Sequence, residues 1–202
     1  MNFWDQQYAG DDYRYGTAPN AFLREQATRF DPASDILVPG DGEGRNGVWL
    51  ATQGHRVTAL DMSPVGLAKA QALAAQQGVT LATLEADLAE WTPPPASCDV
   101  LVLIYLHLPP ALRADVHARL ATALRPGGWL LLEGFHPRQR SEGCTSGGPG
   151  NIEMLFTLDQ LRADWATGGL HEEFAWEGPV TLAEGRGHAG PAWVTRYLAR
   201  RA

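Results

Sequence analysis

The chain has 202 residues, of which 45% are hydrophobic and 19% are charged, so it holds enough apolar residues for one α/β core. Its formal net charge of −7 argues against a nucleic-acid partner, because a nucleic-acid-binding face would have to be basic. Neither an apolar leader nor a run long enough to span a membrane occurs, which predicts a cytoplasmic protein without a membrane partner.

The N-terminal residues 1–30 mix aromatic residues with glycine and aspartate. This mixture is more typical of a lid than of a core strand, and we expect an N-terminal lid or helix here. Phe3 and Trp4 fit simple packing against a sheet equally well. With no proline- or serine-rich linker and no repeat, residues 1–202 are predicted to form a single domain.

The most informative stretch runs from residue 36 to residue 61. An apolar run over 36–38 predicts a buried strand, and the helical spacing of residues 46–52 predicts a helix. Between them, three alternate glycines permit a tight turn with close ligand approach. Asp61 ends the next apolar run, where a carboxylate can accept both hydroxyls of a ribose. The pattern therefore predicts a nucleoside site.

Residues 42–47 also match the dinucleotide pattern G-x-G-x-x-G, which leaves an NAD-dependent oxidoreductase as an alternative. Asp41 and Glu43 in the turn weigh against it, because carboxylates repel a pyrophosphate at a helix N-terminus. A further acid, Asp87, follows a third short apolar run at 79–84, and a dehydrogenase does not require it.

Alternating strand and helix patterns predict a Rossmann-like, doubly wound α/β fold with a seven-stranded, mostly parallel sheet. Helices are expected to fill the intervals, among them 64–77, 109–124 and 158–166. The last two strands are joined by too few residues for a crossover, so they must form an antiparallel hairpin with one reversed C-terminal strand. The predicted strands are 35–39, 56–60, 79–84, 99–104, 128–134, 171–182 and 191–199.

The order of these parts resembles the class I S-adenosylmethionine (SAM)-dependent methyltransferases over nearly the whole chain. The GRNGVWLA continuation of the turn and the N-terminal FWDQQY and YGTAPNAFL segments are similar to a small bacterial branch with tellurite-resistance and thiopurine methyltransferases. The resemblance implies SAM as cofactor, with the glycine turn at its methionine part, Asp61 at the ribose and Asp87 at the adenine amino group. The predicted cofactor-binding set is Tyr15, Gly40, Asp41, Gly42, Gly44, Asn46, Asp61, Met62, Asp87, Leu88 and Ile104.

Ligands of an open α/β sheet bind beyond the carboxyl ends of its parallel strands, so His107, His136 and His188 are expected near the site. An acceptor of high pKa needs a general base, whereas a thiolate or a chalcogen oxyanion needs none. His188, oriented by Glu184 in one loop, is the first candidate base, and His107 with Tyr105 is expected to line the methyl channel. Each histidine fits a hydrogen-bonded rim position as well. His55, His117 and His171 are expected to be structural or solvated.

Residues 136–157 are predicted to form a long mobile loop over the site, in which Arg138 and Arg140 either attract an anionic substrate or are solvated. The histidines and cysteines lack the spacing of metal ligands, so no metal is expected, and two cysteines predict no disulfide framework. No Asn/Asp-Pro-Pro-Tyr/Phe follows the fourth strand, which favours a small-molecule acceptor that reacts at a thiol, chalcogen, oxygen or carboxylate. A non-catalytic SAM-binding protein is the second alternative, and the chain is expected to be a monomer or homodimer.

Overall fold

The structure is a computed structural model that describes residues 2–202, and Met1, which belongs to the predicted N-terminal lid, lies outside them. Its centre is a seven-stranded sheet in the order β3-β2-β1-β4-β5-β7-β6. Only β7 runs antiparallel to its neighbours, so the predicted mostly parallel sheet with one reversed C-terminal strand is confirmed. The strands are β1 (Asp35–Pro39), β2 (Arg56–Asp61), β3 (Ala82–Glu85), β4 (Cys98–Ile104), β5 (Leu124–Phe135), β6 (Leu170–Glu184) and β7 (His188–Arg201).

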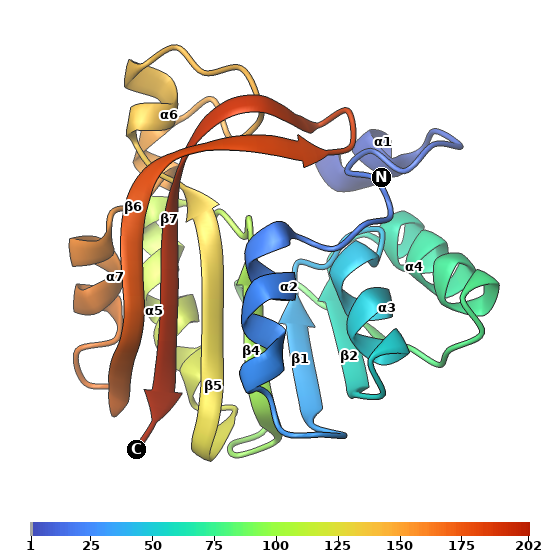
Figure 1. The fold of residues 1–202 in the computed structure, drawn as a ribbon, viewed down its shortest axis with the longest axis horizontal. Helices are drawn as coiled ribbons and strands as arrows, with labels where there is room; N and C mark the ends of the chain where they lie inside the picture. Colours follow the sequence, from blue (N-terminus) through green and yellow to red (C-terminus); the bar gives the residue numbers. More distant parts are fainter. Residues whose placement is uncertain (1) are drawn as a thin grey trace.

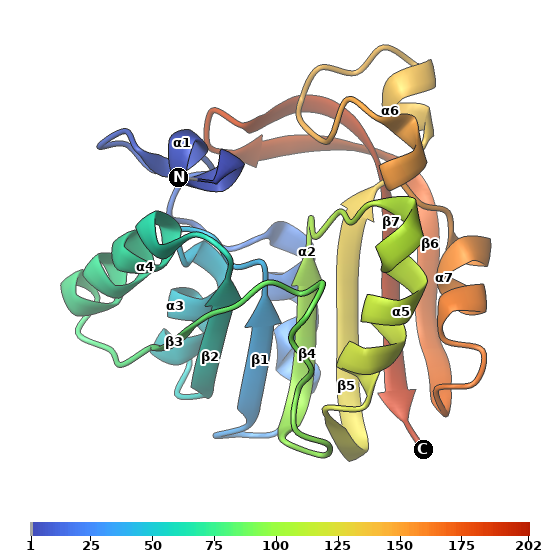
Figure 2. The same cartoon turned by 180° about the vertical axis from the view of Figure 1, so that it is seen from behind.

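Helices cover both faces of the sheet. The helices α2 (Ala21–Gln26), α3 (Arg45–Thr52) and α4 (Pro64–Gln76) pack on one face (Figure 1), and α5 (Pro110–Ala121) and α7 (Leu158–Asp164) pack on the other (Figure 2). The alternation of strand side chains divides the core between the two faces, since Val38 joins the first cluster and Leu37 the second. The remaining helical segments are short: α1 (Phe3–Tyr8), η1 (Ala27–Arg29), α6 (Arg138–Ser141) and η2 (Ile152–Met154).

Two sequence-based expectations about elements are corrected. The third strand begins at Ala82 and not at Val79, because the Val79 N–H donates to Ala74 O at 3.0 Å and belongs to the C-terminal cap of α4. The interval between β3 and β4 holds no helix. Three consecutive prolines at 93–95 have no N–H to donate and fix φ, so this segment crosses as an extended loop.

The C-terminal hairpin is longer than its apolar pattern indicated, since only residues 185–187 separate β6 from β7. Its tip bends over the carboxyl ends of the parallel strands toward α1 (Figure 1). The Gly187 N–H donates to Arg14 O at 3.0 Å and joins this tip to the N-terminal segment. Chain segments far apart in sequence thus meet above the predicted binding edge. That residues 1–202 form one domain stays a prediction.

Candidate functional site

The glycine turn follows β1 and is anchored to the end of β2. The N–H groups of Gly40 and Asp41 both donate to Leu60 O, at 2.7 and 3.2 Å. Gly44 adopts φ +86° at the start of α3, and a Cβ there would lie 2.5 Å from the Ala70 Cβ. Only glycine therefore allows both the left-handed conformation and the close approach of α3 to α4.

Asp61 ends β2 directly beside this turn. Its Oδ2 accepts the Gly42 N–H at 2.9 Å, and its Oδ1 accepts the Ser63 N–H at 2.9 Å. Burial raises the pKa of this carboxyl above its ordinary value. Met62, the next residue, is 40% exposed. The fold thus places an acid and a partly exposed apolar side chain at the edge where a nucleoside would bind.

Asp41 lies inside the turn and is also buried. Both of its carboxylate oxygens accept the Gly47 N–H, at 3.2 and 3.1 Å. Burial raises its pKa to about 8, and the neighbouring Asp61 adds to the rise. The third glycine of the dinucleotide-like pattern therefore gives its N–H to this chain's own carboxyl and does not present it to a pyrophosphate.

The other predicted cofactor residues lie at the same edge. Asp87 is exposed and accepts the Ala89 N–H at 2.8 Å, and Leu88 is buried. Ile104 is buried at the end of β4. In α3, Asn46 is buried and accepts the N–H of Asn20 at 2.9 Å. The structure thus gathers the ends of β1, β2, β3 and β4, as predicted.

A cluster of aromatic rings lies beyond the ends of β4 and β5. The Tyr105 ring lies 4.7 Å from Phe135 and 4.3 Å from His188, and the Tyr15 ring lies 4.4 Å from His188. Tyr105 adopts φ +52°, which is costly for a bulky residue. Its hydroxyl donates to Glu133 Oε1 at 2.8 Å. We call Tyr15, Tyr105, Phe135 and His188 the aromatic cluster.

Two buried ion pairs underlie this cluster. Glu133 on β5 pairs with Arg196, its register partner on β7, and Glu184 at the end of β6 pairs with Arg45 at 2.7 Å. The Asn20 amide joins them, because it donates to Glu133 at 2.7 Å and to Glu184 at 2.9 Å. Each carboxylate thus has a guanidinium partner, which is the condition for burying it.

His188 begins β7 and is paired with Glu184 across the hairpin, so the two residues flank the tip and do not lie in one loop as predicted. Its Nδ1 lies 3.9 Å from Glu184 Oε2, beyond hydrogen-bonding distance. Burial is the main cause of a lowered pKa at His188, with the Arg45 charge adding to it. The imidazole is therefore neutral near pH 7 and able to accept a proton.

Residues 36–128, a little under half of the chain, match the family model described as a methyltransferase domain. The 2-heptyl-1-hydroxyquinolin-4(1H)-one methyltransferase of Mycobacteroides abscessus is 28% identical over 96 residues, and the match spans 46% of this chain and 42% of that relative. The chain therefore matches less than half of the length of this curated relative.

Solved structures show the same fold. TehB from Haemophilus influenzae has a TM-score of 0.70 at 17% identity, with 99% of this chain and 66% of that chain covered. The 1,6-didemethyltoxoflavin-N1-methyltransferase of Burkholderia thailandensis, solved with S-adenosylhomocysteine, has a TM-score of 0.61 at 23% identity, with 90% and 76% covered. The predicted resemblance to class I SAM-dependent methyltransferases is confirmed. A place in the tellurite-resistance branch stays a prediction.

Two histidines expected near the reaction are held in other contacts. His107 is fixed at both ring nitrogens, with Nδ1 3.0 Å from Met154 O and Nε2 accepting the Phe135 N–H at 3.0 Å. Burial lowers its pKa to about 4, so it is neutral, and neither nitrogen is open to an acceptor. His136 Nδ1 accepts the Arg138 N–H at 3.0 Å. Of the three histidines that were expected near the site, His188 is therefore the one that remains a candidate base.

The segment 136–157 is more ordered than its composition predicted, because it contains α6 and η2 and is held by Arg140. The Arg140 guanidinium donates to the carbonyl oxygens of Gly147, Gly148 and Pro149. Arg138 pairs with Glu142 and lies over the Trp193 ring. Both arginines therefore have partners within the chain, and whether they also attract an anionic substrate stays a prediction.

The N-terminal segment packs against the glycine turn, and its role as a lid stays a prediction. We call residues 8–16 the strap. Lys69, the only lysine of the chain, donates to three carbonyl groups of the strap and pairs with buried Glu43 at 2.5 Å. Glu43 also accepts the Arg14 N–H at 2.7 Å. Sequence patterning missed this role, because it depends on the path that the strap takes across α4.

Tyr8 is the strap residue closest to the turn. Its hydroxyl would lie 2.5 Å from a Cβ built on Gly42, and the side chain also contacts Gly66 of α4. The residue is buried, and burial together with the Asp61 charge raises the pKa of its phenol. A buried tyrosine against the glycine turn was not expected from the sequence.

The cysteines Cys98 and Cys144 are free thiols. Over residues 2–202, no group of three or more His, Cys, Asp or Glu side chains is placed to hold a metal ion. Within the same described part of the chain, no helix is long and apolar enough to cross a membrane.

Proposed function

We propose that the chain transfers the methyl group of SAM to a small-molecule acceptor by direct in-line displacement. One observation carries the proposal most strongly: the Asp61 carboxyl accepts the Gly42 N–H of the glycine turn, at the carboxyl edge of a sheet with the methyltransferase strand order. A glycine turn joined to an acid at the end of the next strand is the arrangement that holds an adenosyl ribose.

The cofactor would lie along this edge. Gly40, Gly42 and Gly44 would approach its methionine part, and Asp61 would accept the ribose hydroxyls. The side chain of Met62 would lie beside the adenine. Further contacts to the cofactor would come from Tyr15, Asp41, Asn46, Asp87, Leu88 and Ile104.

SAM supplies an activated methyl group on a sulfonium, so the protein has mainly to align the acceptor and exclude water. The aromatic cluster supports this role, because its rings are packed at the ends of β4, β5 and β7 beside the cofactor edge. For an acceptor that reacts through a hydroxyl, the neutral imidazole of His188 would take the proton. Tyr105 would line the channel, with its phenol fixed by Glu133.

A small-molecule acceptor is supported by the M. abscessus relative, which is a methyltransferase for a hydroxyquinolone. The acceptor would react through a thiol, a chalcogen oxyanion, an oxygen or a carboxylate. The cytoplasmic location and a monomeric or homodimeric state remain part of the proposal.

Calorimetric titration with SAM, S-adenosylhomocysteine and NADH tests the cofactor assignment. We expect saturable binding of both adenosyl ligands, lost in Asp61→Ala and retained in Asp115→Ala, which removes an exposed acid of α5. Binding of NADH alone would restore the oxidoreductase alternative. Incubation with SAM and a panel of thiols, selenite and tellurite then tests turnover by release of S-adenosylhomocysteine. A protein that binds SAM but releases none with any acceptor would instead be a non-catalytic SAM-binding protein.

A further inference from the structure

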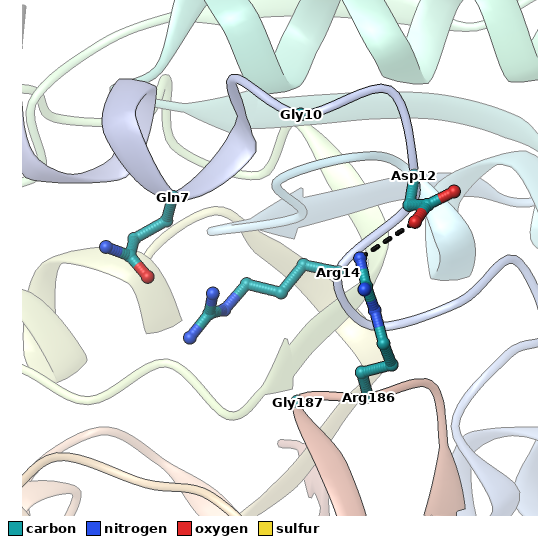
Figure 3. A pocket seen from close by; sticks show the side chains of 6 residues that line it. All are labelled: Gln7, Gly10, Asp12, Arg14, Arg186 and Gly187. Atoms are coloured by element: carbon teal, nitrogen blue, oxygen red, sulfur yellow. Dashed lines mark hydrogen bonds and ion pairs between the residues drawn. The ribbon is translucent and has the colours of Figure 1, made fainter.

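We propose that a pocket beside the aromatic cluster binds an anionic group of the acceptor, an inference that rests on the proposed function. The pocket lies between the strap and the tip of the β6–β7 hairpin and has a volume of about 170 Å³ (Figure 3). It combines two guanidinium groups and one amide with a single carboxylate. Its lining residues are Gln7, Gly10, Asp12, Arg14, Arg186 and Gly187.

The backbone of Arg14 is fixed by hydrogen bonds, whereas its guanidinium group is available to a ligand. Its N–H donates to Glu43 at 2.7 Å, and its carbonyl accepts the Gly187 N–H at 3.0 Å. Within residues 2–202, no carboxylate lies at ion-pair distance from its guanidinium. The side chain points toward Gln7 across the pocket (Figure 3). A rigid backbone reduces the entropy lost when the side chain binds an anion.

The neighbouring arginines at this edge differ from Arg14, because each has an internal partner. Arg45 and Arg196 pair with buried carboxylates, and Arg140 donates to loop carbonyl groups. Arg138 pairs with Glu142. In a chain of net charge −7, a general attraction for anions is absent, so recognition of an anion needs a local cation.

Arg186 provides the second cation. It pairs with Asp12 at 2.9 Å, but the two side chains are 79% and 75% exposed. An ion pair in such a position contributes little to stability, so an incoming anion can compete with Asp12 for this guanidinium. Two planar guanidinium groups and the Gln7 amide suit the geometry of a carboxylate or a similar oxyanion.

The pocket adjoins the aromatic cluster through Gly187. A Cβ at this position would collide with the Tyr15 ring, so glycine is required for the hairpin tip to approach the strap. The centre of the Tyr15 ring also lies 4.4 Å from that of the His188 ring. The anion pocket and the candidate base thus both adjoin the Tyr15 ring. The ligand class that fits both is a small aromatic or heteroaromatic acceptor with an anionic substituent.

Benzoate and its neutral counterpart benzamide test this assignment by calorimetry on the protein saturated with S-adenosylhomocysteine. We expect benzoate to bind more tightly than benzamide. Arg14→Gln should weaken benzoate binding about tenfold, the effect of losing one charge-assisted hydrogen bond, and leave benzamide unchanged. Arg14→Lys should recover part of the loss. The control Arg162→Gln, which removes an exposed guanidinium on α7, should bind both probes like the wild type.

Failure of wild-type protein to bind benzoate, or equal benzoate affinity in the wild type and Arg14→Gln, would overturn the assignment of the pocket. If the wild-type protein does not bind S-adenosylhomocysteine at all, the proposed function itself is refuted. Benzoate titration of the ligand-free protein would then still decide whether the pocket selects an anion.

Discussion

Asp41→Asn gives a sharp test of how the turn is built, because it replaces a buried carboxyl with a neutral group of the same shape. The amide oxygen of asparagine can still accept the Gly47 N–H. In the folded wild type, burial raises the Asp41 pKa from 3.8 to about 8. The folded state thus binds a proton that the unfolded state releases. The resulting stability is complete below pH about 4, decreases as the pH rises, and is lost at pH about 8.

The size of the effect follows from the slope of this dependence. Each pH unit inside the window changes the free energy of unfolding by about 1.4 kcal/mol. Between pH 5 and pH 7 the wild type should therefore lose about 2.7 kcal/mol relative to Asp41→Asn. The carboxyl is fully buried, so solvent screening does not reduce this order-of-magnitude figure.

Urea unfolding at pH 5, 6 and 7, followed by tryptophan fluorescence, measures this difference. Asp11→Asn, at an exposed position of the strap, is the matched control and should follow the wild type at each pH. Parallel pH dependences for the wild type and Asp41→Asn would show that Asp41 is ionised in the folded protein. The raised pKa of the turn would then be wrong.

Three further changes probe other parts of the site. Gly44→Ala should cost about 3 kcal/mol of stability from its positive φ and its contact with Ala70, and a loss below about 0.5 kcal/mol in chemical unfolding would contradict this. Lys69→Met should leave the buried Glu43 carboxylate without its cation and with only the Arg14 N–H as a partner, cost about 3 kcal/mol of stability and speed amide exchange in the strap; unchanged exchange would show that the strap does not depend on the Lys69–Glu43 pair. His188→Asn should slow methylation of a hydroxyl acceptor by about a hundredfold or more and spare a thiol acceptor. In the wild type, the rate with a hydroxyl acceptor should fall only below pH about 6.5, because burial holds the His188 pKa below that value, and equal losses with both acceptors would exclude a base.

The mostly parallel sheet and the cofactor edge could be predicted because they depend on local patterns. Short apolar runs mark the buried parallel strands, and the glycine turn and Asp61 lie within one βαβ unit. The reversed strand followed from the length of a single connection. One expectation failed for an equally local reason. The helix that was expected before β4 is prevented by prolines 93–95.

The ion pairs beneath the aromatic cluster could not be predicted in the same way. Glu133 and Arg196 are 63 residues apart and meet only because β5 and β7 pair in one register. A carboxylate at the end of an apolar strand signals a buried partner, but the sequence does not say which cation it is. The role of Lys69 likewise depends on the path of the strap across α4.

A crystal structure of the protein with S-adenosylhomocysteine tests the central claim most directly. We predict the ribose hydroxyls at hydrogen-bonding distance from the Asp61 carboxyl, the homocysteine along Gly40–Gly44, and the sulfur facing the aromatic cluster. A ligand bound elsewhere, or with its sulfur directed away from Tyr105 and His188, would contradict the account of this site as a methyl-transfer centre.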